Sequence, residues 1–340
     1  MPHPFRIREI AEQSGLSEST VDRVLNERGN VRESTVEQVR IAIADLERQR
    51  AQLRIGGRTF LIDVVVDSPP QFAAMVRTAL EAELSSLQPA IIRARFHFTE
   101  DASPPAVSSM LAKIRQRKTH GIILKAPDSP AVAEAIDAVG APVVTLVTDV
   151  PASRRVDYVG LDNRAAGATA AYLMTQWFGE RPGDVLAVRG SGLFRGDDER
   201  EMGFRSILRA SEPQRRQFDV LDPGGSPERL YRDVRGLLER EPDIRGVYAM
   251  YSMGHTAIIR AFADTGIRYR AYITHDVNDE TRALLHRGSI SAVLHHDLRE
   301  DLRRACRTIL QAQRALPGPI VSAPSPVHVV TPHNIPYALR

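Results

Sequence analysis

The stretch "IREIAEQSGLSESTVDRVLNERGNV" (residues 7–31) decides the fold of the first part of the chain, and its pattern predicts two short helices joined by a tight turn. Within it, Ala11, Gly15 and Val21 stand four and six residues apart. A small residue at the first position lets two helices cross closely, glycine at the second permits a left-handed turn, and an apolar residue at the third packs back on the first helix. This spacing is typical of a helix-turn-helix.

The outer face of the second predicted helix carries polar side chains. Ser17 can cap this helix through its hydroxyl, and Glu18, Ser19 and Arg23 follow on the exposed face. In a helix-turn-helix, the N-terminal part of this helix reaches the base edges of DNA. The spacing alone leaves two interpretations open: DNA binding, and a plain helical hairpin with solvated charges.

The composition is that of an ordinary globular chain with two or three folding units. Of the 340 residues, 43% are hydrophobic and 26% charged, and the net charge of +3 argues neither for nor against nucleic acid. The single cysteine, Cys306, excludes a disulfide framework and a multi-cysteine zinc site, and we expect it to be a buried apolar residue. We find no leader and no membrane-spanning apolar run, so we expect a cytoplasmic protein without membrane contact.

An alternation of strand and helix follows the all-helical residues 5–53. Adjacent glycines in "RIGGR" mark the change, and "TFLIDVVV" (59–66) is a buried-strand run. Such alternation implies parallel sheets with right-handed crossovers, and the number of units favours two α/β lobes. The proline-rich tail from residue 316 should lie extended on the surface. Further strands are expected within 120–127, 142–149, 158–163, 184–190, 246–252, 271–276 and 292–297.

The opening stretch resembles the headpiece of the lactose-repressor (LacI/GalR) family of transcription regulators, whose outline is "DVAxxAGVSxxTVSRVLNxxxxV". The matching residues have the same order and spacing as in the family and the same position at the N-terminus. The rest of the chain resembles the family's sugar-binding core. The resemblance implies an all-α helix-turn-helix headpiece followed by a two-lobed α/β core like a periplasmic binding protein, with two Rossmann-like parallel sheets. The matching residues are Ile10, Ala11, Gly15, Ser17, Thr20, Val21, Arg23, Val24, Leu25, Asn26 and Val31.

The resemblance also implies how the chain divides. We expect a headpiece, a hinge or linker, and a core that binds a ligand and dimerises. The segment "DNRAAG" (162–167) would have a structural role there, as a helix cap and a place of close helix approach. The expected ranges are 1–50 for the headpiece, 51–58 for the hinge, 59–340 for the core, 59–162 plus 294–322 for the first lobe, and 163–293 plus the C-terminal segment for the second.

By resemblance, headpiece residues acquire roles on DNA. Glu18 and Ser19 would occupy the two specificity positions, and Arg23 would be the major-groove arginine. Arginine can bind guanine O6 and N7 together, worth about 1–3 kcal/mol of discrimination, and a carboxylate can accept from cytosine N4. Asp22 stands where the family usually has serine, and a carboxylate near phosphates lowers affinity unless it is paired. Thr20, Asn26 and backbone amides are expected to position the headpiece on the DNA phosphates, and Ser17 is expected to belong to the same DNA-binding surface.

The hinge departs from the family pattern. Relatives carry a "YxPNxxARxL" segment whose short helix inserts a leucine into the minor groove, whereas this chain has "LERQRAQLRIGGR" (46–58). Leu53 could still supply an apolar wedge that kinks DNA. A plain continuation of the preceding helix into a linker is an equally good interpretation.

Polar residues that follow predicted strands mark the expected cleft between the lobes. Thr148 and Asp149 end one strand, Asp276 ends another, and Phe72 could stack on an apolar sugar face. By resemblance, Arg200 matches the family's ligand-binding arginine, and Asp276 matches its acidic residue after a late strand. A structural ion pair between Arg200 and Asp276 is the alternative.

Two positions of the cleft differ from the family's sugar-binding pattern. His296 stands where ribose-type cores often carry glutamine, and Tyr251 stands where an Asn-Asp pair is expected. Both are candidate ligand residues, although packing alone is an equally good interpretation of His296. These differences leave the identity of the sugar or polyol open.

The sequence as a whole predicts a ligand-responsive, sequence-specific DNA-binding regulator, and the resemblance implies its partners. We expect a homodimer, with a tetramer as the alternative, on near-palindromic double-stranded operator DNA, and a small sugar or polyol as effector. We expect no catalytic residue, no metal and no cofactor, because G-x-S-x-G, HExxH and CxxC motifs are missing. A sugar-processing enzyme or a solute-binding protein on the same scaffold is the competing hypothesis.

Overall fold

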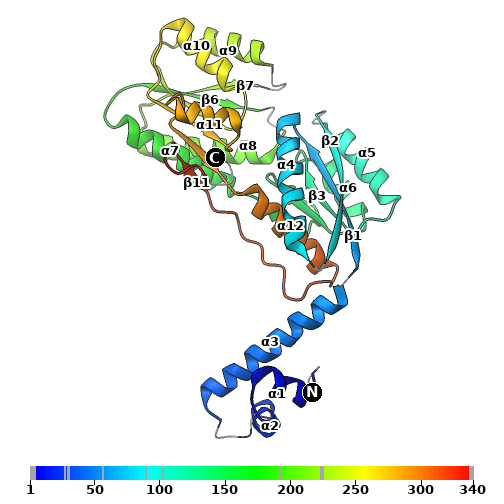
Figure 1. Cartoon of the computed structure of the whole chain (residues 1–340). Helices are drawn as coiled ribbons and strands as arrows, with labels where there is room; N and C mark the ends of the chain where they lie inside the picture. Colours follow the sequence, from blue (N-terminus) through cyan, green and yellow to red (C-terminus); the bar gives the residue numbers. More distant parts are fainter. Residues whose placement is uncertain are drawn as a thin grey trace.

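The computed structural model describes residues 5–26, 28, 31–55, 57–88, 90–100, 103–190, 193–222 and 226–336, without the side chains of residues 48–55. The chain opens with a helical headpiece made of α1 (Ile7–Ser14), α2 (Glu18–Leu25) and α3 (Glu33–Ile55). The first two helices lie against the first half of α3, whose other end leads into the α/β part (Figure 1).

A small apolar core holds the three headpiece helices together. Gly15 ends α1 in the left-handed conformation with φ 68°, as its position in the motif predicts. Ala11 and Val21 are buried where α1 meets α2, and Val39 closes the core from α3. Val36, about one turn before Val39 on α3, is 43% exposed and lies outside this core. The structure confirms the helix-turn-helix geometry.

The first lobe is built on a parallel sheet with strand order β2-β1-β3-β4-β5. This 2-1-3-4-5 order is that of flavodoxin-like folds, in which the crevice for ligands opens where the order reverses. The strands are β1 (Thr59–Asp67), β2 (Ile91–Thr99), β3 (Gly121–Lys125), β4 (Val143–Leu146) and β5 (Asp157–Val159). The helices around the sheet are α4 (Pro70–Glu83), η1 (Leu84–Leu87), α5 (Pro104–Arg115), α6 (Pro130–Ala138) and α12 (Leu298–Ala312).

The second lobe repeats this order with one strand added. Its sheet reads β11-β10-β9-β8-β6-β7, parallel except for β11, which pairs antiparallel with β10. The strands are β6 (Asp184–Arg189), β7 (Gln217–Leu221), β8 (Ile244–Ala249), β9 (Ala271–His275), β10 (Ala292–His295) and β11 (His328–Val330). The helices are α7 (Asn163–Phe178), α8 (Arg195–Ser211), α9 (Pro227–Arg240), α10 (His255–Thr265) and α11 (Asp279–His286).

Within the described residues, the chain crosses between the lobes three times: after β5, after β10 and after α12. The last crossing is the long segment that runs outside the ribbons from α12 to β11 (Figure 1). The first and third crossings are hydrogen-bonded, because Ser325 N donates to Gly160 O at 2.8 Å. The second carries His296, which is described with the site.

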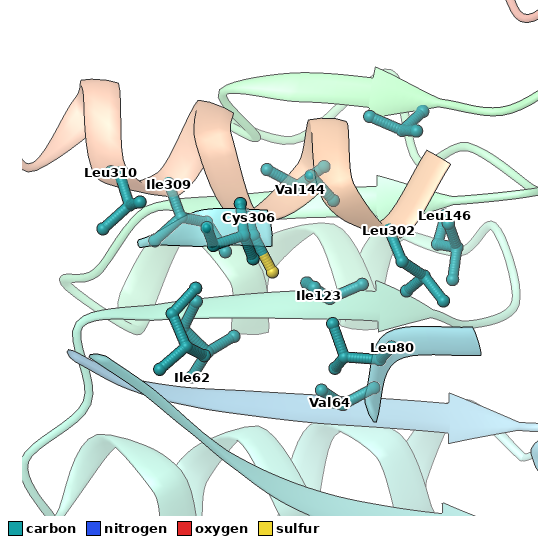
Figure 2. Close-up of a cluster of buried hydrophobic side chains, with 14 of the residues drawn as sticks. Ile62, Val64, Leu80, Ile123, Val144, Leu146, Leu302, Cys306, Ile309 and Leu310 are labelled. Atoms are coloured by element: carbon teal, nitrogen blue, oxygen red, sulfur yellow. The ribbon is translucent and has the colours of Figure 1, made fainter. Parts of the chain in front are cut away.

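Cys306 lies in the apolar core between α12 and the first sheet. It points into a layer of aliphatic side chains that includes Ile123 and Val144, with Leu302 and Ile309 beside it on the helix (Figure 2). Burial raises the pKa of its thiol to about 12. The thiol is therefore inert at neutral pH, and the expectation of a buried apolar cysteine is confirmed.

Candidate DNA-binding surface and interlobe ligand site

The N-terminus of α2 presents its polar side chains to solvent. Ser17 is the N-cap residue, and its hydroxyl accepts from Thr20 N at 3.3 Å, as the sequence predicts. Glu18, Ser19 and Arg23 are all exposed on this helix. The face opposite the headpiece core is thus free to meet a DNA groove.

Asp22, the unusual carboxylate of the motif, has partners of its own. It accepts from Arg28 Nη1 at 3.2 Å and from Asn26 Nδ2 at 2.8 Å. Arg23 instead donates from Nε to Ser19 O at 3.3 Å and forms no ion pair with a carboxylate of the described residues. The Asp22 charge is therefore partly neutralised next to the DNA face, and the Arg23 guanidinium is left available for an acceptor on DNA.

The α3 helix continues without a break into the segment expected to be the hinge. It ends at Ile55, so the expected boundary at residue 50 falls inside one helix. This favours the interpretation of the segment as a helical continuation. The side chain of Leu53, the candidate wedge, lies outside the described residues.

The point where the strand order reverses in the first sheet lies between β1 and β3. Asp67 and Lys125 are the last residues of these two strands, and Lys125 Nζ donates to Asp67 O at 2.8 Å. Sequence reasoning missed both residues, although each ends a strand that it had located. Strand ends at a reversal of order are where open α/β sheets bind ligands.

The N-terminus of α8 in the second lobe contacts the first lobe. Gly196 N donates to Thr148 Oγ1 at 3.1 Å, and Arg195 Nη1 lies 3.4 Å from Asp128 Oδ2. Lys125 Nζ stands 3.7 Å from the centroid of the Phe194 ring, a cation–π contact between the lobes. Thr148 was predicted as a ligand residue, and in this structure its hydroxyl holds the two lobes together.

Charged groups gather between the lobes around Lys125. Burial lowers the pKa of Lys125 to about 8, against the opposing influence of Asp197 and Asp67. Burial also raises the pKa of Asp197, although Arg200 and Lys125 act in the other direction. A lysine and an aspartate whose pKa values are both displaced by burial mark a candidate binding site.

Arg200 is buried in the second lobe with 4% exposure. Its Nε donates to Asn163 Oδ1 at 2.8 Å and its Nη1 to Met250 O at 2.5 Å. Among the described residues it forms no ion pair with Asp276, so the alternative of a structural Arg200–Asp276 pair is not what the structure has. The guanidinium is held by neutral acceptors, and its positive charge acts to lower the pKa values of Lys125 and Asp197.

Asp276 follows β9 in a left-handed backbone conformation with φ 59°. His296 Nε2 lies 3.7 Å from Asp276 Oδ1, while His296 Nδ1 lies 2.5 Å from Asp301 Oδ2. Ser325 Oγ donates to the other oxygen of Asp301. His296 therefore belongs to a buried hydrogen-bonded network at the crossings between the lobes, and its ring lies next to the Asp276 carboxylate. The left-handed backbone of Asp276 is strained for a non-glycine residue, and such strain is often found at functional sites.

The remaining predicted ligand residues divide into two groups. Phe72 lies beside the cluster, with its ring centroid 5.7 Å from Lys125 Nζ. Tyr251 instead donates to Asp222 Oδ2 at 2.6 Å, and burial together with Asp222 raises the pKa of its phenol well above 10.0. Asp149 is bound by Arg155, whose Nη2 donates to it at 2.5 Å, so this carboxylate stabilises a turn of the first lobe.

The described residues contain no group of three or more histidine, cysteine, aspartate or glutamate side chains arranged to hold a metal ion. Across the same residues, no helix combines the length and the apolar character needed to cross a bilayer.

Comparisons with known proteins agree with both parts of the molecule. Residues 6–48 match the model of bacterial regulatory proteins of the lacI family, and residues 64–314 match that of the periplasmic binding protein domain. A search of curated protein sequences found no match.

Solved structures share the fold of the α/β part. One is GanP, a glucose-galactose binding protein from Geobacillus stearothermophilus, with a TM-score of 0.72 and 20% identity, covering 82% of this chain and 99% of that one. Another is a putative LacI transcriptional regulator from Bacteroides fragilis, with a TM-score of 0.71 and 13% identity over 82% and 99% of the two chains. A solute-binding protein from Actinobacillus succinogenes with bound D-allose has a TM-score of 0.71 and 16% identity over 81% and 98%.

A headpiece with the lacI-family pattern and geometry precedes a two-lobed binding domain that accounts for most of the chain. The chain therefore belongs to the lacI family of bacterial regulatory proteins and is a ligand-responsive, DNA-binding transcriptional regulator.

Proposed function

We propose that the protein is a repressor whose operator affinity changes when a small sugar or polyol binds between its lobes. The observation that carries this proposal is that one chain has both an exposed α2 face and a cluster of charged groups between its two lobes. The neighbours that bind sugars support the ligand class. We place the protein in the cytoplasm with its operator, and the proposal assigns it binding without catalysis.

A homodimer on a near-palindromic operator follows from the size of the reading element. The α2 helix has 8 residues, so one headpiece contacts few base pairs. Twofold symmetry doubles the contact set and predicts two half-sites related by inversion. We propose residues 1–50 as the headpiece, 51–58 as the connection and 59–340 as the core through which the protomers associate.

Ligand control would act through the separation of the two headpieces. A ligand changes this equilibrium only by its differential affinity for the two lobe arrangements. Reversing a 99:1 population requires about 5.5 kcal/mol of differential binding free energy across the dimer. Contacts that exist only when the lobes are closed on a ligand are the source of such a difference.

Replacing Arg23 by alanine is expected to weaken binding to the preferred operator by about 10–100-fold, since a bidentate arginine–guanine contact is worth about 1–3 kcal/mol. Competition mobility shifts with operator and scrambled duplex measure the effect on selectivity. The matched control is Arg235→Ala, which removes an exposed arginine of α9 that pairs with Glu239. Unchanged selectivity in the Arg23 variant would refute the assignment of α2 as the reading helix.

Replacing Asp276 by asparagine is expected to weaken ligand binding by about 10–100-fold, because a hydrogen bond to a charged group contributes about 1.5–3 kcal/mol. Asparagine tolerates the left-handed backbone, so the fold is kept. Operator binding without ligand should be unchanged. The measurement is thermal shift and calorimetry against sugars and polyols, with the exposed Asp233→Asn of α9 as control. Equal ligand affinity in both variants would remove Asp276 from the site.

A further inference from the structure

We propose that Lys125 and Asp197, one from each lobe, are joined by the ligand, and that together they select an uncharged, hydroxyl-bearing compound over sugar acids and sugar phosphates. The inference rests on the proposed function, because it concerns the same interlobe site. Neither residue was singled out by the sequence motifs, and the two come from different lobes.

Contacts of Phe194 bring these two residues near each other between the lobes: Lys125 Nζ lies 3.7 Å from the centroid of its ring, and Asp197 N donates to its carbonyl oxygen at 3.0 Å. Lys125 ends β3 in the first lobe, beside the reversal of strand order, and Asp197 lies in the first turn of α8 in the second lobe. Asp197 is the strongest charged influence on the pKa of Lys125. Both residues are only half-buried by accessible surface, although desolvation dominates the pKa shift of each. Both side chains therefore keep some exposure to solvent, through which a small molecule can contact them.

Both groups have hydrogen-bonding capacity that the protein does not use. The Asp197 carboxylate makes no hydrogen bond and no ion pair with the described residues, and Arg200 and Lys125 influence it only as nearby charges. Lys125 Nζ donates one hydrogen bond, to Asp67 O at 2.8 Å. An ammonium group has three N–H donors, so two of them remain for another acceptor.

The chemistry of this pair decides which ligand group fits. An ammonium group only donates and a carboxylate only accepts, whereas a hydroxyl does both. One hydroxyl, or two on adjacent carbons, can accept from Lys125 and donate to Asp197 at once. Such a group satisfies both charges without adding one, and its contacts exist only when the lobes are close together.

Charged ligands are disfavoured by the surrounding charges. The cations that act on this pair or belong to it are Lys125, Arg189 and Arg200, and the carboxylates are Asp67, Asp197, Asp198 and Asp276. A phosphate or carboxylate would add a further negative charge to a site in which carboxylates already outnumber cations. Burying an anion without a matching cation is costly, so sugar acids and sugar phosphates should be rejected.

Two aromatic rings complete the site on either side of the ammonium group. Lys125 Nζ lies 3.7 Å from the ring centroid of Phe194 and 5.7 Å from that of Phe72. The rings come from opposite lobes, like the charged pair. Their faces offer apolar walls for the C–H surface of a polyol, while the charged pair binds its hydroxyls.

The test begins with the wild-type protein and named probes. Differential scanning fluorimetry and calorimetry are run with D-glucose, D-galactose, D-arabinose, D-allose and sorbitol, and with D-gluconate and D-glucose 6-phosphate. We expect at least one neutral probe to raise the melting temperature and neither charged probe to do so. Tighter binding of gluconate or glucose 6-phosphate than of every neutral probe would overturn the inference.

The variants then test the two residues with the neutral probe that binds. Lys125→Met and Asp197→Ala should each weaken it at least tenfold while operator binding without ligand stays unchanged. The exchange variant Lys125→Asp/Asp197→Lys keeps one donor and one acceptor facing each other, so it should bind the probe more tightly than either single variant. The matched control is Lys113→Met, on the exposed side of α5.

The outcomes separate this inference from the proposed function. Full probe affinity in both single variants would overturn the role of the pair and leave ligand control standing. If no probe of either class binds the wild type or changes its affinity for operator, the proposed function fails, and the inference fails with it. Operator binding by every variant shows that the fold is intact, so a lost probe response is assigned to the site.

Discussion

The variant Gly203→Ala is expected to lower the free energy of unfolding by about 3 kcal/mol, the upper part of the usual range for overpacking. A Cβ atom at this position would stand 2.0 Å from Arg164 O in the neighbouring helix α7. Gly167 of α7 makes the same close approach from the other side, because a Cβ atom added there would stand 1.9 Å from Arg200 O in α8. Backbone faces backbone at this crossing, so no side chain can rotate to relieve the clash.

The melting temperature should fall by about 6–12 °C, taking about 2–4 °C for each kcal/mol in a unit of this size. The matched control is Gly236→Ala in α9, where the nearest atom to a new Cβ is Arg240 Nη1 at 3.5 Å. Alanine is expected to stabilise that helix by about 0.5–1 kcal/mol, so the same substitution has opposite signs at the two positions. A Gly203→Ala protein that melts with the wild type would contradict the close crossing.

The close packing of α7 on α8 could be anticipated from the sequence. The segment 162–167 was expected to cap a helix and to allow close approach, and both are confirmed: Asp162 Oδ1 accepts from Ala165 N at 2.8 Å, and Gly167 touches α8. The same crossing brings Asn163 to Arg200. Packing of α7 on α8 thus sets the position of the arginine next to the proposed ligand site.

All interior strands of the two sheets were predicted, whereas three of the four edge strands were missed. The strands β1, β3 to β6 and β8 to β10 lie within or overlap the expected segments. Sequence reasoning omitted β2, β7 and β11, each of which is the terminal strand of its sheet at one side. In β2 and β7 few positions are buried, so their hydrophobic pattern is weak, and only pairing with β1 and β6 reveals them.

The site shows what a linear pattern can and cannot give. Asp276 and Arg200 could be proposed as ligand residues from the sequence because their motifs are local. Lys125 and Asp197 become neighbours only when two sheets face each other, so no spacing in the sequence links them. Asp149 has the local pattern of a ligand residue, yet Arg155 takes its carboxylate through a turn of the first lobe that the sequence did not specify.

The variant Asp301→Ala is expected to destabilise the protein by about 3–5 kcal/mol, the usual loss when one partner of a buried ion pair is removed. The side chains of His296 and Asp301 are 2% and 1% exposed and lie 2.5 Å apart. Asp301 also accepts from Ser325, so the network ties together the second and third crossings between the lobes. Its removal leaves the buried imidazole of His296 without its carboxylate partner, where the chain crosses between the lobes.

The pH dependence of this loss follows from both pKa shifts. Burial acts to lower the pKa of His296, but Asp301 outweighs it, so the pKa is raised above 6.5. Burial acts to raise the pKa of Asp301, but His296 outweighs it, so the pKa is lowered below 3.8. The histidine contribution is complete below 6.5 and is lost as pH rises through the raised value. The aspartate contribution is complete above 3.8 and is lost as pH falls through the lowered value.

Urea unfolding from pH 4 to 9 should therefore show the largest difference between wild type and Asp301→Ala at about pH 5–6, with the difference shrinking toward alkaline pH. The control is Asp279→Ala, since that side chain is 94% exposed in its pair with Arg282. A surface pair of this kind contributes about 0–1 kcal/mol and should give no such pH profile. A constant difference across the range would mean that His296 is neutral in the folded protein, and that Asp301 acts there only as a hydrogen-bond acceptor.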